Sequence, residues 1–202
     1  MTNHLNYFSD SERGSIKKFE EWRTRILQPI SRILAAIGVT PNMISAFGML
    51  MLIGFIAFIR LNPLYAILFL ALHVILDAFD GSLARYMKLD SNAGALVDMI
   101  CDHTGMVIVT TTLVYQGFIQ GTIGLLYVYL YTLMIVCIIV LNRFGMALRF
   151  VIRTKYFLYA LVAMWAIWRI DYVNTAIIAF ILLMIAPTTI GFCKLYRYFQ
   201  HN

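Results

Sequence analysis

Long apolar runs, separated by short polar breaks, fill the chain from about residue 41 onward. A helix needs about 20 predominantly apolar residues to cross the hydrocarbon core of a bilayer. Six runs approach or exceed that length. The fifth is the weakest, because its apolar part is short and basic residues crowd its start. The runs cover residues 41–60, 63–87, 92–117, 121–142, 153–170 and 173–193. The pattern therefore predicts an all-α membrane protein with six transmembrane helices.

The segment before these runs has a different pattern. In residues 12–36, apolar side chains recur every three or four positions, and charged side chains lie mostly between them. This spacing is typical of an amphipathic helix, which we expect to be kinked or divided near Pro29. The helix either lies in the membrane interface, our first expectation, or packs on the protein's own cytoplasmic face. The apolar positions are Ile16, Phe19, Trp22, Ile26, Ile30, Ile33 and Leu34.

These patterns divide the chain into three parts. We expect a cytoplasmic N-terminal segment carrying the amphipathic helix (1–40), a transmembrane domain (41–195) and a short cytoplasmic tail (196–202). If the N-terminus is cytoplasmic, 14 of the 16 Lys and Arg residues lie in inside segments. Such a bias is the usual signature of cytoplasmic loops. Both termini are then expected in the cytoplasm.

Composition agrees with a membrane protein and changes the interpretation of the net charge. The chain is 61% hydrophobic and 13% charged, whereas soluble domains are about 25% charged. Its mean hydropathy is +0.80. A net charge of +6 would raise the question of nucleic acid in a soluble protein. Anionic lipid headgroups beside the cytoplasmic loops explain it better here, so we expect membrane lipids and no nucleic acid as partners.

Four aspartates lie inside two neighbouring predicted spans. Asp77 and Asp80 are three residues apart in the second span, and Asp98 and Asp102 are four apart in the third. Each pair therefore lies on one face of its helix. The two spans are joined by a short loop near Asp90, so the two faces can meet near the cytoplasmic end. An ionisable group in a span is costly, and by default it marks a functional site.

Clustered carboxylates need compensating positive charge, because they repel one another. Two divalent cations would supply it. Oxygen ligands alone, without histidine or thiolate, favour Mg²⁺ or Mn²⁺.

The residues between the aspartates suit a phosphate-containing substrate. Gly81 and Ala84 continue the face of the first aspartate pair, and their small side chains let a ligand approach the helix. Arg85 lies on the same face and offers a planar cationic fork for phosphate. Gly94, four residues before Asp98, gives the facing helix the same clearance.

Together these residues form the pattern D-x2-D-G-x2-A-R-x8-G-x3-D-x3-D across residues 77–102. It resembles the signature of the CDP-alcohol phosphatidyltransferase family, with all eight defining positions filled at the family's spacing. The segment from Thr40 to Ser45 is similar to the T-P-N-x-x-T/S element common there. The predicted topology extends the resemblance over nearly the whole chain.

The resemblance implies a reaction and roles for these residues. A phosphatidyl group would pass from CDP-diacylglycerol to the hydroxyl of a small alcohol, with release of cytidine monophosphate. The implied metal ligands are Asp77, Asp80, Asp98 and Asp102, with Asp102 also the catalytic general base. The cytidine diphosphate portion would be held by Asn42, Gly81, Ala84 and Arg85. A homodimer, a cytoplasmic active site and a bacterial or archaeal cell membrane are further expectations.

The acceptor alcohol is the least determined part. The arginines after the fourth span, Arg143, Arg149 and Arg153, either serve topology and lipid contact or bind a phosphate on the acceptor. The second interpretation puts glycerol 3-phosphate and inositol phosphate first, with serine and inositol still open. The residue after the last aspartate is His103, not the Lys that we associate with phosphatidylglycerophosphate synthases.

Some residues near the motif have a simpler interpretation. His73 lies one turn before Asp77, but we expect a histidine satisfied within the bundle rather than a partner of that carboxylate. His103 points about 100° away from Asp102 on a helix, so packing is expected there too. Cys101, Cys137 and Cys193 have no metal-type spacing and are expected to be reduced packing residues.

Two alternative functions stay open at this point. One is a CDP-choline or CDP-ethanolamine type phosphotransferase that acts on diacylglycerol. The other is a divalent-cation transporter, since aspartates in spans also occur in such proteins. A transporter gives no reason for Gly81, Ala84 and Arg85.

Overall fold

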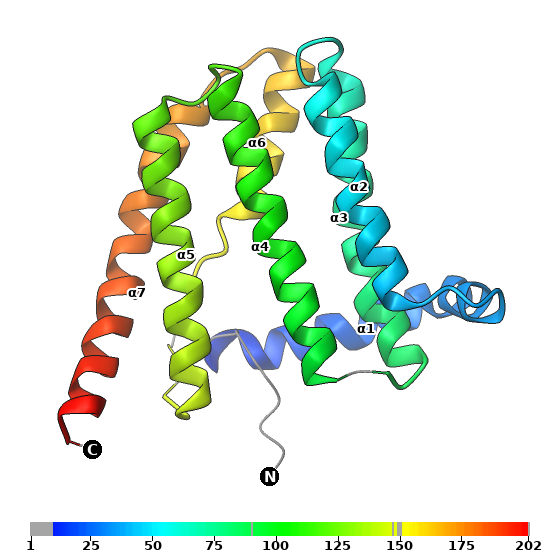
Figure 1. The fold of residues 1–202 in the computed structure, drawn as a ribbon, viewed down its shortest axis with the longest axis horizontal. Coiled ribbons are helices and arrows are strands. Elements are labelled where there is room, and N and C mark those ends of the chain that lie inside the picture. Colours follow the sequence, from blue (N-terminus) through cyan, green and yellow to red (C-terminus); the bar gives the residue numbers. More distant parts are fainter. Residues whose placement is uncertain (1–9, 90, 147, 149–150, 202) are drawn as a thin grey trace.

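The computed structural model describes residues 10–89, 91–146, 148 and 151–201. Arg149 and Asp90 therefore lie outside the described residues. Those described form seven helices and no strand. The helices are α1 (Asp10–Ala36), α2 (Pro41–Phe58), α3 (Pro63–Tyr86), α4 (Asn92–Tyr115), α5 (Gly121–Arg143), α6 (Lys155–Trp168) and α7 (Val173–His201). Figure 1 shows α2 to α7 as a bundle, with α1 lying across the end at which α3 and α5 finish.

Five of the helices are long and apolar enough to cross a membrane: α2, α3, α4, α5 and α7. The expectation of six spans is met only in part, because α6 has 14 residues. That length corresponds to about 21 Å of rise, against a hydrocarbon core of about 30 Å. Residues 151–153, just before α6, are not helical, and α6 begins midway along the bundle (Figure 1). Arg169 then ends α6 in the left-handed conformation, with φ of 60°.

Local sequence accounts for where several helices begin. Thr40 caps α2 by accepting a hydrogen bond from the Met43 N–H, and Pro41 occupies the first helical turn, where its missing N–H costs nothing. Asn62 caps α3 in the same way, followed by Pro63. These caps set the register of α2 and α3, which pack closely along their length.

The core of the bundle is apolar and lies mainly away from the aspartates. It includes buried side chains contributed by α2 to α7, namely Leu52, Phe55, Leu70, Met106, Leu113, Tyr127, Met134, Leu158 and Ile177. Many other large apolar side chains on the same helices are exposed. A bundle that is apolar both inside and outside is what a lipid environment requires.

Helix α1 packs against α3 and continues through Pro29 without a break, so the expected division of the helix is absent. Its exposed positions include Trp22, Ile26 and Ile33. An apolar exposed side and a side packed on the bundle fit a helix at the membrane interface, and that placement remains a prediction. At the other end of the chain, α7 runs to His201, so much of the segment expected to be a tail is helical.

Candidate active site

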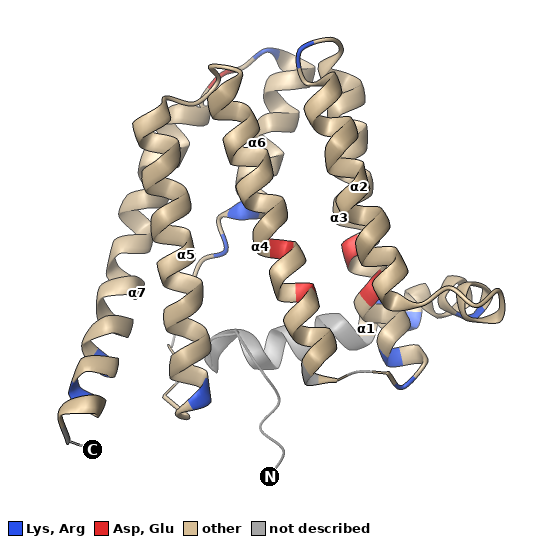
Figure 2. Cartoon of the chain, viewed as in Figure 1, with Lys and Arg blue, Asp and Glu red and all other residues tan. Residues whose placement is uncertain are grey.

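Three of the four motif aspartates come together between α3 and α4. One carboxylate oxygen from each of Asp77, Asp80 and Asp98 lies within 4.8 Å of the other two. The acidic positions of the two helices face each other in the half of the bundle nearer to α1 (Figure 2). The spacing of three residues thus puts two carboxylates on the face of α3 that meets α4, as the sequence predicts.

Two hydrogen bonds hold the Asp80 carboxylate. The Ser45 hydroxyl donates a hydrogen bond of 2.5 Å to its Oδ2 atom, and the Gly81 N–H donates one of 2.5 Å to its Oδ1 atom. Ser45 lies on the second turn of α2, in the segment whose Thr40 caps that helix. The Thr40–Ser45 element therefore both starts α2 and orients a carboxylate of α3.

The trio suits a hard divalent cation. Three carboxylates this close repel one another unless a positive charge lies between them, and all the ligand atoms are oxygens. Each carboxylate oxygen has two lone pairs, so the bonds to Asp80 leave it able to bind a metal. The residues therefore fit one Mg²⁺ or Mn²⁺ ion, and a second ion stays a prediction.

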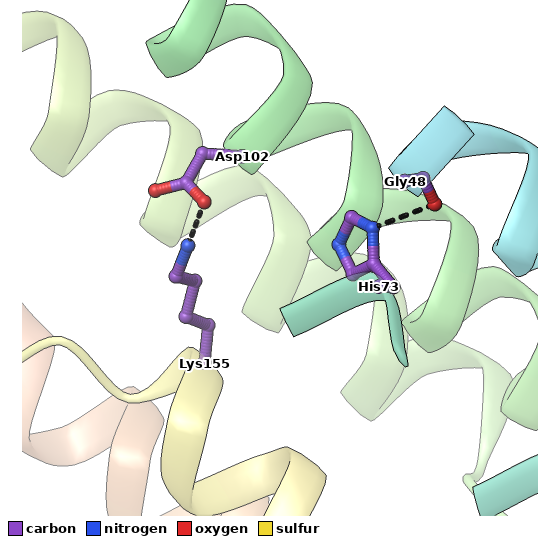
Figure 3. Close-up of polar contacts among 4 residues, drawn as sticks. All are labelled: Gly48, His73, Asp102 and Lys155. Atoms are coloured by element: carbon purple, nitrogen blue, oxygen red, sulfur yellow. Dashed lines mark hydrogen bonds and ion pairs between the residues drawn. The ribbon is translucent and has the colours of Figure 1, made fainter. Parts of the chain in front are cut away.

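Asp102 is not one of the three carboxylates, but it lies within electrostatic range of each of them. It forms an ion pair with Lys155, the first residue of α6 (Figure 3). Both side chains are buried, with 3% of Lys155 and 12% of Asp102 exposed. A buried carboxylate needs a partner of opposite charge, and Lys155 supplies it. Metal binding and general-base catalysis by Asp102 stay predictions. The structure adds an ion pair with Lys155 that the sequence did not reveal.

Lys155 is the residue that sequence reasoning missed. The pattern counts it among the basic residues of a cytoplasmic loop, where it supports the topology. In the structure its ammonium nitrogen also lies 4.6 Å from the centre of the Tyr156 ring, a cation–π distance. Beside it, the Tyr127 and Thr154 hydroxyls share a hydrogen bond of 2.9 Å. Lys155, Thr154 and Tyr127 are all buried, so they form a polar cluster at the start of α6.

The two histidines near the motif each contact a neighbouring helix, and both lie within electrostatic range of Asp102. The His73 Nδ1 atom lies 3.0 Å from the Gly48 carbonyl oxygen of α2 (Figure 3). The His103 Nε2 atom lies 3.1 Å from the Thr132 hydroxyl of α5, and its ring stacks on Tyr131.

The residues expected to hold the cytidine diphosphate portion lie around the same end of α3. Gly81 and Arg85 share a face there, and the Arg85 Nε–H donates a hydrogen bond of 2.9 Å to the Thr24 hydroxyl of α1. Ala84 is partly buried beside them, and Asn42 is exposed in the first turn of α2. Among the described residues, a side-chain carbon added at Gly94 would meet the Ser91 hydroxyl at 3.4 Å. The clearance that Gly94 would give a ligand stays a prediction.

The three arginines proposed for an acceptor phosphate are not equivalent. Arg143 is exposed in the last turn of α5, and Arg149 lies outside the described residues. Arg153 is partly buried and within electrostatic range of Tyr131, which is also in range of Lys155 and Asp102. Of the two that the structure describes, Arg153 is thus the one near Lys155 and Asp102.

Comparison with known proteins gives one family. The chain matches the CDP-alcohol phosphatidyltransferase family model over residues 38–198. It is 36% identical over 85 residues to an archaetidylinositol phosphate synthase of Pyrococcus horikoshii, which is 40% of this chain and 45% of the relative. An uncharacterized protein of Aquifex aeolicus is 32% identical over 89 residues, 43% of this chain and 45% of that protein. The chain thus aligns with less than half the length of either curated relative.

The fold has a counterpart among solved structures. The crystal structure of Mycobacterium tuberculosis phosphatidylinositol phosphate synthase with CDP-DAG bound superposes with a TM-score of 0.62 at 18% identity. The superposition covers 85% of this chain and 92% of that one. At this identity the likeness concerns the fold. The family model spans the helical bundle and all eight motif positions, and the chain belongs to the CDP-alcohol phosphatidyltransferase family.

Proposed function

We propose that the protein transfers a phosphatidyl-type group from CDP-diacylglycerol to the hydroxyl of a small phosphorylated alcohol, with inositol phosphate as the first candidate. The carboxylate trio beside the Gly81 face, in a chain of this family, is the observation that carries the proposal. The names of two relatives, an archaetidylinositol phosphate synthase and a phosphatidylinositol phosphate synthase, favour inositol phosphate over glycerol 3-phosphate.

On the donor side, the protein's own groups suit a diphosphate. Gly81 has no side chain, so the donor can approach the α3 backbone, and Arg85 offers two donor groups in one plane. Asp77, Asp80 and Asp98 would hold the divalent metal. When bound there, the metal supplies positive charge that stabilises the diphosphate in the transition state.

On the acceptor side, Asp102 is the proposed general base. It takes the proton of the acceptor hydroxyl as the hydroxyl oxygen bonds to the phosphorus that carries the lipid alcohol. The bond from that phosphorus to the bridging oxygen breaks, and cytidine monophosphate leaves with the electron pair. Lys155, already paired with Asp102, holds this carboxylate in place.

Two cations lie near Asp102 and could bind a phosphate on the acceptor. Lys155 is buried beside Asp102, and Arg153 precedes it by two residues. This grouping supports a phosphorylated acceptor, since a phosphate would bring negative charge to both cations. The cytoplasmic position of the site and a homodimer are parts of the same proposal. The names of the relatives favour neither alternative function, the CDP-choline type phosphotransferase or the cation transporter.

The test is an acceptor screen on purified protein. CDP-diacylglycerol and Mn²⁺ are offered with inositol phosphate, glycerol 3-phosphate, inositol, serine, choline or ethanolamine, and the lipid product is identified by mass spectrometry. A CDP-linked diether lipid serves as a second donor. We expect one product, from inositol phosphate, that disappears in Asp102→Asn while this variant still binds the CDP-lipid. A product from an unphosphorylated alcohol, or normal turnover by Asp102→Asn, would contradict the acceptor or the base.

A further inference from the structure

We propose that Arg23 of α1 binds the diphosphate of the donor together with Arg85, so that the N-terminal helix forms one wall of the donor site. The inference rests on the proposed function for the identity of the donor. It adds a residue that belongs neither to the motif nor to the matched part of the chain, which begins at residue 38.

The two guanidinium groups converge on the bare position at Gly81. A side-chain carbon placed there would lie 3.5 Å from the Arg23 Nη2 atom, and 3.7 and 3.8 Å from the Arg85 Nη1 and Nη2 atoms. Each of these side chains comes from a different helix. The space over Gly81 is therefore bordered by two planar, permanently charged forks, the geometry that binds phosphate oxygens in pairs.

The charge balance of this pair depends on the metal site. Asp80 and Asp98 are both within electrostatic range of Arg23, and their negative charge offsets its positive charge. A divalent cation on the trio takes up the charge of those carboxylates. Two guanidinium groups in proximity then need an anion, and a diphosphate carries enough negative charge to satisfy both.

Arg23 also has hydrogen-bonding capacity to spare. Its Nε atom is buried and has no hydrogen-bond partner among the described residues. A buried donor without a partner costs free energy, so a site that supplies an acceptor on ligand binding recovers that loss. A phosphate oxygen over Gly81 would be such an acceptor.

The position of Arg23 is fixed by contacts on either side of it. The hydroxyl of Thr24 accepts a hydrogen bond of 2.9 Å from the Arg85 Nε–H, which ties the neighbouring position of α1 directly to the motif. Ser31, two turns later, is buried. Helix α1 crosses the end of α3 at this place (Figure 1). Arg23 is thus held over the motif by packing.

The apolar exposed side of α1 begins next to this residue. Trp22 precedes Arg23 and Ile26 follows it by almost one turn, and both are exposed. A donor whose diphosphate lies over Gly81 has acyl chains that must enter lipid. An apolar surface beside the diphosphate position is where those chains would leave the site.

The test compares Arg23→Gln with Arg25→Gln, an exposed arginine two residues along the same helix. Binding of CDP, CMP and CDP-diacylglycerol is measured by calorimetry with saturating Mn²⁺, and turnover is not needed. Loss of a charge-assisted bond is worth about tenfold or more in affinity. We expect Arg23→Gln to weaken binding of CDP and of the CDP-lipid by about that factor, and CMP binding by less. Arg25→Gln should bind all three as the unchanged protein does.

Other outcomes separate the possible failures. Mn²⁺ affinity is measured without nucleotide by electron paramagnetic resonance. It shows whether Arg23 acts only by changing how the aspartates bind the metal. If Arg23→Gln changes Mn²⁺ affinity but keeps the ratio of CDP to CMP affinity, the inference is wrong. Arg23→Lys keeps the charge without the fork and should give an intermediate loss, and it serves if Arg23→Gln does not fold. A protein that binds no CDP-lipid at all would overturn the proposed function, whereas binding unaffected by either Arg23 variant would overturn only this inference.

Discussion

The ion pair of Lys155 and Asp102 should contribute measurably to the stability of the protein. Replacing Lys155 by Met keeps an unbranched side chain only one atom shorter. It leaves the Asp102 carboxylate without its partner, and only 12% of that side chain is exposed. Removing one member of a buried pair costs about 3–5 kcal/mol. In a chain of this size, 1 kcal/mol shifts the melting temperature by about 2–4 °C. We expect Lys155→Met to melt roughly 6–12 °C lower in detergent and chelator, from the low end of that cost.

The double variant tests the physical reason. Lys155→Met with Asp102→Asn removes both charges, so its loss should be clearly smaller than the sum of the two single losses. Melting is followed by tryptophan fluorescence, with Lys88→Met as the control because Lys88 is exposed. The control should melt within about 2 °C of the unchanged protein, since exposed charges contribute little. Additive single losses would show that the two side chains do not stabilise each other.

Four further outcomes concern the metal, the acceptor and the packing. Arg153→Gln should raise KM for a phosphorylated acceptor about tenfold and the donor KM less, while Arg143→Gln changes neither; equal effects on both substrates would exclude a role in acceptor binding. Ser45→Ala should weaken Mn²⁺ binding about tenfold, because Asp80 loses the bond that orients it, and an unchanged affinity would refute this. Chelation should abolish turnover and Mn²⁺ restore it; turnover in chelator would remove the metal from the mechanism. In Gly105→Ala the new carbon would lie 2.7 Å from a histidine ring on α3, and a loss of about 1–3 kcal/mol is expected in thermal unfolding, whereas unchanged stability would mean that the helices part easily.

The amino-acid sequence was sufficient to group the carboxylate trio, together with Asp102, because helix geometry leaves little choice. Residues three apart share a face on any helix, and a short loop brings α3 and α4 together, so the pattern alone could group Asp77, Asp80 and Asp98. The long spans were equally local. Each of these features depends on neighbours in the chain.

Lys155 and Arg23 could not be assigned because their partners are distant in the chain. In the sequence, Lys155 looks like a charged residue of a loop. Nothing in the run 153–170 shows that a helix starts at Lys155, midway along the bundle. Arg23 lies on the polar side of the amphipathic helix. The pattern of polar and apolar residues does not reveal that α3 packs against that helix near Arg23. The fifth predicted span, 153–170, is a shorter helix in the structure for a related reason. Hydropathy counts residues and cannot tell a helix from the non-helical chain that leads into it.

The aspartates also affect how the protein can enter a membrane. The most apolar window of α4 has a mean hydropathy of 1.3, the lowest of the five long helices, against 2.5 for α5. An aspartate at the centre of an inserting helix costs about 2.5–3.5 kcal/mol, whereas each large aliphatic residue returns only about 0.3–0.6. Alone, α4 would therefore partition poorly into lipid from the translocon. We expect α4 to insert together with α3 as a hairpin, so the two helices that build the metal site also depend on each other during biogenesis.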